Sequence, residues 1–283
     1  MICNMMELNH DQVLSILPDR AVDAHKGDFG KILLLCGSKG YTGAAYLAAQ
    51  ASLRSGAGLV FLGVPESIYQ IEAVKLNEAI VFSLPDENGK LSAAAIPEIL
   101  QRLPKMDAVL IGPGLGQSDG TFQVVKTVLE QAACPIVLDA DGINLIAAHK
   151  DIVRGRTAPT ILTPHAGEFA RLGGDPQQRA VAAEAMARVL GCILLLKGHH
   201  TVITDGETTY INPTGNPGMA VGGSGDVLAG IITALVGQGI APLEAAACGA
   251  WLHGAAGDIC AAEIGQYGML PTDMLNALPR LLK

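Results

Sequence analysis

Short apolar runs alternate along the chain with longer segments that have the periodicity of helices. The first run, residues 31–37, is continuously apolar after its lysine, as in a strand that is covered on both faces. The Ala-rich segment 43–55 favours a closely packed helix, and residues 59–64 form a second predicted strand. A strand, a helix and a strand in this order predict a right-handed crossover between parallel strands.

The same alternation continues through the rest of the chain. Further strands are predicted at 79–84, 108–111, 136–139, 160–163, 193–197, 201–204 and 208–211, and helices at 93–103, 120–132, 142–149, 177–190, 227–236, 242–262 and 271–282. The last two strands turn at Asp205-Gly206 and are expected to form an antiparallel hairpin. The pattern predicts an α/β fold in three layers, with a mostly parallel central sheet and helices on both faces.

The length of the chain limits the number of domains, and its net charge limits the class of binding partner. The 283 residues suffice for one large α/β domain or two small ones. We favour a single domain over residues 1–283, because no interior stretch has the composition of a linker. The formal net charge of −8 argues against a nucleic-acid partner, which would require a basic face.

The cysteines and the apolar stretches bear on location. The six cysteines form no CxxC pair and have no metal-ligand spacing to histidine, which favours reduced thiols in the cytoplasm; they are Cys3, Cys36, Cys134, Cys192, Cys248 and Cys260. The N-terminus carries Glu7 and Asp11 and lacks the apolar core of a secretory signal. The longest uncharged apolar stretch, 227–243, is too short for a membrane span and is interrupted by glycine and proline, so no membrane segment is predicted.

The most unusual stretch, residues 212–234, changes from Asn, Pro and Gly residues to the apolar run of the predicted helix 227–236. Its centre, Gly222-Gly223-Ser224-Gly225, is therefore expected at a helix N-terminus, where free amides and the helix dipole bind phosphate. Glycine lets a ligand approach closely because it has no Cβ. Asp226 beside an anion site indicates proton transfer or metal binding, although Ser224 or Asp226 could instead cap the helix.

Five further loops follow predicted strands, which is where ligands gather in open parallel sheets. They are residues 37–45, 112–116, 139–141, 163–168 and 197–201. The first of these lacks the dinucleotide-binding glycine pattern and the Walker lysine, so an ordinary turn is an open alternative. The sequence GPGLG of the second fits a rigid turn as well as a binding loop.

The polar residues of these loops have both chemical and structural interpretations. Asp139 and Asp141 could bind a cation, while Asp141 is equally suited to cap the next helix. His165 could contact a substrate, but a single histidine after a strand is more often structural, and Glu168 suits the first turn of a helix. Lys197 at the end of an apolar strand could bind phosphate, and its charge needs a partner.

Two adjacent histidines, His199 and His200, favour a solvated turn over a metal site, because neighbouring side chains are expected to diverge. No set of metal-ligating side chains is predicted. Each loop alone is a weak signal, and it is their joint position after strands that indicates a site.

With these motifs in hand, the chain resembles the ADP/ATP-dependent NAD(P)H-hydrate dehydratase family, a branch of the ribokinase-like fold, over nearly its whole length. The matching segments are HKGDFGKILLLCGSKGYTGAA, RSGAGLV, GPGLG, LDADGIN, LTPHAGEF, LLKGHHTVI and NPTGNPGMAVGGSGDVLAGI, of which the last two together are specific. The resemblance implies a repair enzyme that uses a nucleotide to remove water from hydrated NADH or NADPH (the S epimer). It also implies that ADP is converted to AMP and phosphate.

The resemblance assigns roles to individual residues. Those implied to contact the hydrated dinucleotide are Ala44, Ala45, Gly114, His165 and Asp226. Those implied to hold the adenine nucleotide are Lys197, Gly198, His199, His200, Thr201 and Gly225, with the phosphates expected on Gly222, Gly223, Ser224 and Gly225. Val221 departs from the family, which often has threonine there, and a hydroxyl next to the anion loop is lost.

A mechanism follows from the chemistry of leaving groups. Hydroxide leaves poorly and phosphate leaves readily, so water loss is expected to be coupled to phosphoryl transfer. In this hypothesis Asp226 accepts the proton of the substrate hydroxyl as that oxygen attacks the terminal phosphate. The amides of residues 222–225 stabilise the transferring phosphoryl group, and Mg²⁺ bridges the phosphates of ADP or ATP.

Two other functions stay open from the sequence. A kinase of the same fold, acting on a vitamin precursor or a sugar, would use the same anion loop and Asp226. A nucleotide sensor without catalysis would have no use for that carboxylate. The resemblance also implies a homotetramer or larger assembly. Because no epimerase-like domain precedes the matching segments, a companion epimerase is expected on a separate chain.

Overall fold

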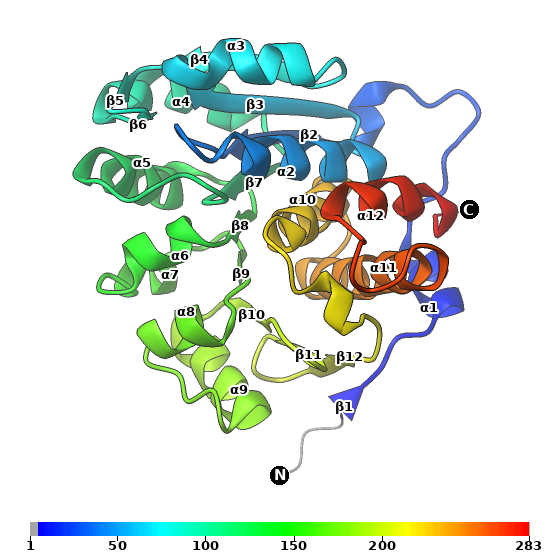
Figure 1. Cartoon of the computed structure of the whole chain (residues 1–283). Helices are drawn as coiled ribbons and strands as arrows, with labels where there is room; N and C mark the ends of the chain where they lie inside the picture. Colours follow the sequence, from blue (N-terminus) through cyan, green and yellow to red (C-terminus); the bar gives the residue numbers. More distant parts are fainter. Residues whose placement is uncertain (1–4, 283) are drawn as a thin grey trace.

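The computed structural model describes residues 5–282, and its centre is a ten-stranded sheet (Figure 1). The strands lie in the order β1, β12, β11, β10, β9, β8, β7, β2, β3, β4. Their bounds are β1 Met5–Met6, β2 Lys31–Leu35, β3 Leu59–Pro65, β4 Ile80–Leu84, β7 Ala108–Ile111, β8 Ile136–Leu138, β9 Thr160–Leu162, β10 Ile193–Leu196, β11 Thr201–Thr204 and β12 Thr209–Asn212. A separate antiparallel pair consists of β5 Asp86–Glu87 and β6 Lys90–Leu91.

Most neighbouring strands are parallel. From β10 through β9, β8, β7, β2 and β3 to β4 every pair is parallel, whereas β11 is antiparallel to both β10 and β12. The predicted mostly parallel sheet and the hairpin after residue 201 are therefore confirmed. Because parallel strands point the same way, the loops that follow them emerge at one edge of the sheet.

Helices cover both faces of the sheet (Figure 1). Their bounds are α1 His10–Ile16, α2 Thr42–Arg54, α3 Glu66–Lys75, α4 Ile96–Arg102, α5 Asp119–Gln131, α6 Asp141–Ile146, α7 Asp151–Arg154, α8 Ala166–Arg171, α9 Arg179–Leu190, α10 Ser224–Gly237, α11 Pro242–Glu263 and α12 Pro271–Ala277. Short 3₁₀ helices are η1 Lys26–Phe29, η2 Ala93–Ala95, η3 Leu103–Lys105, η4 Pro217–Met219 and η5 Leu278–Arg280.

The alternation of side chains along β2 explains the two cores. Ile32 and Leu34 point into a cluster with α2, α10 and α11, while Leu33 and Leu35 point into a cluster with α4, α5 and α9. All four side chains are fully buried. A strand buried on both faces must be apolar at every position, which is why residues 31–37 form a continuous apolar run.

Helix α10 reaches the sheet because glycine and alanine let it pack closely against α2. A Cβ at Gly230 would lie 2.4 Å from the carbonyl oxygen of Ala48. The hydroxyl of Ser52 donates a hydrogen bond to the oxygen of Gly230 at 3.0 Å, across the same contact. The apolar run of α10 is thereby buried, and its first turn is held at the edge where the parallel strands end.

Several sequence predictions differ from the structure in their bounds. The predicted helix 271–282 stops at Ala277 and continues as η5, because Pro279 lacks the amide that an α-helix needs. The predicted helix 93–103 likewise divides into η2 and α4 near Pro97. The short elements α1, α7, α8, β1, β5 and β6 were not predicted, since a few residues carry too little periodicity. Helix α3 was also not predicted: it spans ten residues but buries only Ile68 and Glu72, so its apolar stripe is weak.

Two further sequence predictions concern thiols and membranes. Cys3 lies outside the described residues, and the other five cysteines are free. Between residues 5 and 282, no helix is long and apolar enough to cross a membrane.

Candidate active site

The first loop and the GPGLG loop are joined by hydrogen bonds beyond the ends of β2 and β7. The amide of Gly37 donates to Pro113 O at 2.8 Å, and the hydroxyl of Ser38 donates to Gly114 O at 2.7 Å. Gly114 has a φ of +60°, and a Cβ there would lie 2.7 Å from that of Ala44. Two residues implied to contact the dinucleotide, Ala44 and Gly114, are therefore neighbours.

The second group of residues is the first turn of α10. Gly223 occupies the N-cap position with a φ of 98°, in the left-handed region, and a Cβ there would lie 2.5 Å from Leu47 Cδ1. The amides of Gly225 and Asp226 precede that of Val227, which makes the first i to i−4 bond, to Gly223 O at 3.2 Å. These first-turn amides suit an anion.

The capping alternative at this turn is wrong. Gly223 caps α10 without a side-chain hydrogen bond, so neither Ser224 nor Asp226 is the cap. Ser224 Oγ instead lies 3.2 Å from Nε2 of His253 on α11. Burial lowers the pKa of His253 to about 4, so its ring is neutral at pH 7. A Cβ at Gly222 would meet no atom within 4 Å, which leaves the outer side of the loop open.

Asp226, in the same turn, has a carboxyl group whose pKa is raised. Burial is the largest cause that raises its pKa to about 7, the negative charge of Asp139 adds to it, and the positive charge of Lys197 opposes it. A carboxylate with a pKa near 7 has the basicity that a general base needs at neutral pH.

The half-buried Lys197 and the buried Asp139 form an ion pair next to this turn. The ammonium of Lys197 lies 2.7 Å from Asp139 Oδ1, and the hydroxyl of Thr163 donates to the same oxygen at 2.7 Å. Burial acts to lower the pKa of Lys197, but the charges of Asp139 and Glu168 outweigh it, and the net pKa is raised. The prediction that the charge of Lys197 needs a partner is confirmed.

Asp139 and Asp141 have different hydrogen-bond partners. Asp141 accepts hydrogen bonds from the amide of Gly116 at 2.9 Å and from the side chain of Gln117 at 3.0 Å, which ties it to the GPGLG loop. The N-cap of α6 is Ala140, with a φ of 48°, so the prediction of Asp141 as the cap is wrong by one residue. Within residues 5–282, no group of three His, Cys, Asp or Glu side chains could hold a metal ion.

His165 caps helix α8. Its Nδ1 accepts hydrogen bonds from the amides of Gly167 at 2.9 Å and Glu168 at 3.3 Å, and a carboxylate oxygen of Glu168 accepts from the amide of His165 at 2.8 Å. The structural interpretations of both residues are confirmed. The imidazole is still 54% exposed, so it remains accessible to a ligand. Glu168 also lies 4.0 Å from the ammonium of Lys197.

The loop 197–201 is held from behind by Arg179 of α9. Its guanidinium donates to Leu196 O at 3.0 Å and lies so close to Gly198, with a φ of +147°, that a Cβ there would be 2.9 Å from it. The two histidines of the loop do not diverge as expected. Their ring centroids are 4.0 Å apart, because His200 adopts a left-handed φ of 51°.

Three residues of the site were missed from the sequence: Thr163, Arg179 and His253. Thr163 stands in a motif that was singled out, but its bond to Asp139 depends on β8 and β9 being neighbours. Arg179 and His253 come from helices α9 and α11, where no strand-end signal could find them.

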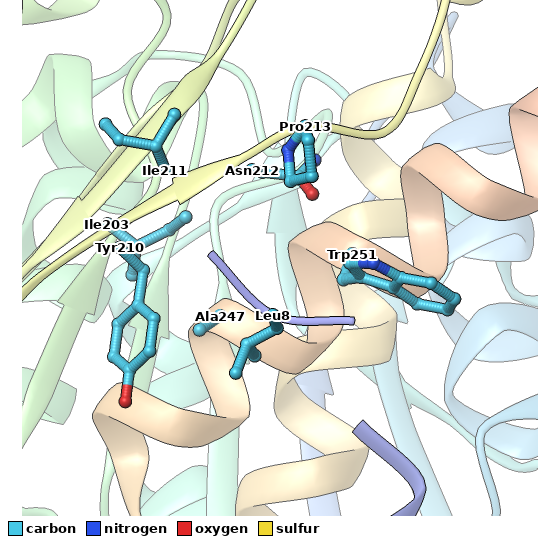
Figure 2. A pocket seen from close by; sticks show the side chains of 8 residues that line it. All are labelled: Leu8, Ile203, Tyr210, Ile211, Asn212, Pro213, Ala247 and Trp251. Atoms are coloured by element: carbon cyan, nitrogen blue, oxygen red, sulfur yellow. The ribbon is translucent and has the colours of Figure 1, made fainter. Parts of the chain in front are cut away.

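The cavity of Figure 2 lies elsewhere. It has a volume of about 10 Å³, roughly one water, and is formed where the hairpin of β11 and β12 meets α11 and Leu8. Tyr210 and Trp251 line it, and none of the predicted site residues does. It is therefore a packing defect rather than a ligand site.

Comparison with known proteins shows which family the chain belongs to. The family model described as NAD(P)H-hydrate dehydratase matches residues 32–280. The chain belongs to the NAD(P)H-hydrate dehydratase family. A bifunctional NAD(P)H-hydrate repair enzyme of Moorella thermoacetica is 47% identical over 277 residues, which are 95% of this chain and 52% of the relative. The corresponding enzyme of Escherichia coli is 37% identical over 279 residues, 96% of this chain and 51% of the relative.

Solved structures agree. The ADP/ATP-dependent NAD(P)H-hydrate dehydratase of Bacillus subtilis, co-crystallised with ATP and Mg²⁺, has a TM-score of 0.83 and 32% identity, covering 98% of each chain. A ribokinase-like superfamily protein of Enterococcus faecalis has a TM-score of 0.86 and 30% identity, covering 98% of this chain and 95% of its own. The family and the ribokinase-like fold expected from the motifs are therefore confirmed.

The organisation of the curated relatives differs from one expectation. This chain spans about half their length, and they are named bifunctional, so in them a second activity belongs to the same chain. In these relatives the second activity is fused to the same chain, whereas the sequence of this protein predicts a separate companion.

Proposed function

We propose that this chain dehydrates hydrated NADH or NADPH in a nucleotide-dependent reaction and thereby restores the reduced cofactor. The observation that carries the proposal is Asp226, a carboxylate with a pKa near 7 in the first turn of a glycine-capped helix, beside the charged Lys197. The turn offers amides to a phosphate, and the carboxylate offers a base to an alcohol. Family membership points to the same reaction.

In the proposed reaction Asp226 takes the proton from the substrate hydroxyl while that oxygen attacks the terminal phosphorus of ADP. The O–P bond to the leaving AMP breaks, and the first-turn amides of α10 stabilise the transferring phosphoryl group. The ring nitrogen of the substrate then donates its electron pair, the C–O bond breaks, and phosphate leaves. The ring carbon next to the former C–O carbon loses a proton to water or to the departing phosphate, and the carbon–carbon double bond of the dihydronicotinamide forms. The products are NADH or NADPH, AMP and phosphate.

We place the nucleotide along residues 197–201 and 222–225, with the hydrated dinucleotide against Ala44, Gly114 and His165. Ala45, implied by the resemblance as a fourth contact, has a fully buried side chain and would act through its backbone. Mg²⁺ would be held mainly by the nucleotide phosphates and water, since the described carboxylates form no cluster for it. A single domain is supported by the unbroken ten-stranded sheet. The cytoplasmic location and the homotetramer stay predictions.

The test is incubation of the chain with hydrated NADPH and ADP or ATP, followed through the absorbance of the reduced nicotinamide. We expect the absorbance to recover and inorganic phosphate to appear. Accumulation of a phosphate ester from an added alcohol would instead identify a kinase, and tight nucleotide binding without turnover would identify a sensor.

The role of Asp226 is tested with the variant Asp226→Asn, which keeps the shape of the side chain and removes the base. We expect dehydration to fall by at least about a hundredfold. Asp151→Asn, at a carboxylate that is 92% exposed on α7, is the control for the loss of one negative charge. Near-normal dehydration by Asp226→Asn would eliminate the proposed base.

A further inference from the structure

Asp139 is a buried carboxylate that the proposed reaction does not use directly. It stands at the end of β8 and is 1% exposed. One of its oxygens, Oδ1, receives both the ammonium of Lys197 and the hydroxyl of Thr163, each at 2.7 Å. Two donors on one oxygen fix the carboxylate in a single orientation.

The ion pair of Asp139 and Lys197 lies directly against the first turn of α10. A Cβ at Gly225 would lie 3.4 Å from Lys197 Nζ and 3.9 Å from Asp139 Oδ2. Glycine therefore leaves both charges facing the turn that carries Asp226. Charges a few ångströms apart in a partly dry site interact far more strongly than they would in water.

The other titratable groups around this turn come from several elements. Glu168 of α8 lies 4.0 Å from Lys197 Nζ, and His253 of α11 contacts Ser224. Cys36 follows β2 and is fully buried. Burial is the largest cause that raises the pKa of its thiol, and the negative charges of Asp226 and Asp139 raise it further. The two charges that act on the pKa of Asp226 are thus the carboxylate of Asp139 and the ammonium of Lys197, and their effects are opposite.

We infer that Asp139 is a positioning residue that keeps Asp226 competent to accept a proton at neutral pH. Asp139 acts on Asp226 in two ways. Its own negative charge opposes the ionisation of Asp226. It also holds the ammonium of Lys197 at a fixed place, where the positive charge favours that ionisation and limits the first effect. The inference rests on the proposed function of Asp226. The raised pKa of Asp226, for which burial is the first cause and the charge of Asp139 the second, agrees with this geometry.

Removing the charge of Asp139 and removing that of Lys197 should shift the pH profile of kcat/KM in opposite directions. A purely structural role of the ion pair would not produce opposite shifts. In Asp139→Asn a negative charge is lost, so the acidic limb of the pH profile of kcat/KM should move to lower pH by about one pH unit. In Lys197→Met a positive charge is lost, and the limb should move to higher pH by a similar amount. The profile is measured at saturating nucleotide on the full chain.

Glu72→Gln is the matched control for these variants. Glu72 is also a fully buried carboxylate with a lysine partner, at 3.4 Å from Lys75 Nζ, but it lies on α3 and outside the candidate site. Its removal should leave the acidic limb in place. Limbs that do not move in Asp139→Asn and Lys197→Met, or that move in the same direction, would overturn the inference.

A second measurement separates this inference from the proposed function. Titration of the Asp226 carboxyl carbon by NMR, assigned with Asp226→Asn and recorded without substrate, needs no activity. We expect titration near pH 7 in the unmodified chain and a midpoint about one pH unit lower in Asp139→Asn. A midpoint below pH 5 in the unmodified chain overturns the inference, whether or not any variant folds. Absence of dehydration with the expected titration would instead reject the proposed function alone.

Discussion

Replacing Asp226 by asparagine should stabilise the folded chain at pH 8 while it removes turnover. The folded state holds the Asp226 carboxyl at a pKa of about 7, against an ordinary value of 3.8, first because of burial and then because of the charge of Asp139. Above pH 7 the fold therefore contains a partly buried negative charge that the unfolded chain solvates freely. Asparagine has no such charge.

The expected gain in the free energy of unfolding follows from the raised pKa of Asp226. Because the folded pKa is raised, the stability from this group is fully present below pH 3.8 and is lost as the pH rises through about 7. A rise from 3.8 to about 7 corresponds to at most about 4 kcal/mol. Partial exposure of Asp226 reduces this, and the variant loses a favourable carboxylate at a helix N-terminus, worth about 0.5 kcal/mol. We expect a net gain of about 2 kcal/mol at pH 8 and about 1 kcal/mol or less at pH 5.

Urea unfolding of the full chain without nucleotide, at pH 5 and at pH 8, measures this difference. A gain of about 2 kcal/mol raises the urea midpoint by roughly 1 M if the denaturant slope is unchanged. Asp151→Asn, at an exposed carboxylate, controls for the change in net charge. Equal midpoint differences at the two pH values, or a lower midpoint for Asp226→Asn at pH 8, would refute the reasoning.

Three further variants test the packing and the loops. Gly230→Ala places a Cβ 2.4 Å from a main-chain carbonyl oxygen of α2 and should cost about 1–3 kcal/mol in urea unfolding, whereas Gly43→Ala, with no atom within 4 Å, should not destabilise. Arg156→Ala strands two main-chain carbonyls that its guanidinium binds and should cost about 2–4 kcal/mol by the same measurement; a cost below 1 kcal/mol would contradict this. Gly198→Ala strains a left-handed residue against Arg179 and should raise the KM for nucleotide about tenfold, so an unchanged KM would count against residues 197–201 as the nucleotide loop.

The order of elements and the general position of the site could be predicted from the sequence. Parallel strands that are buried on both faces need apolar residues on both sides. The runs at 31–37, 108–111 and 193–197 can therefore be recognised as strands from the local sequence alone. Glycine before an apolar run marks a helix start in the same local way, which is why the sequence placed residues 222–225 at the start of the helix that the structure shows as α10. Patterns of this kind need only neighbours along the chain.

The partners of the functional side chains were decided by the tertiary structure alone. Asp139 and Lys197 are 58 residues apart in sequence and meet because β8, β9 and β10 are adjacent in the sheet. His253 reaches Ser224 because α11 packs beside α10. The protonation of Asp226 depends on these long-range neighbours, since charge interactions act through space. The sequence therefore determined which residues are available for chemistry, and the fold decided which charges surround them.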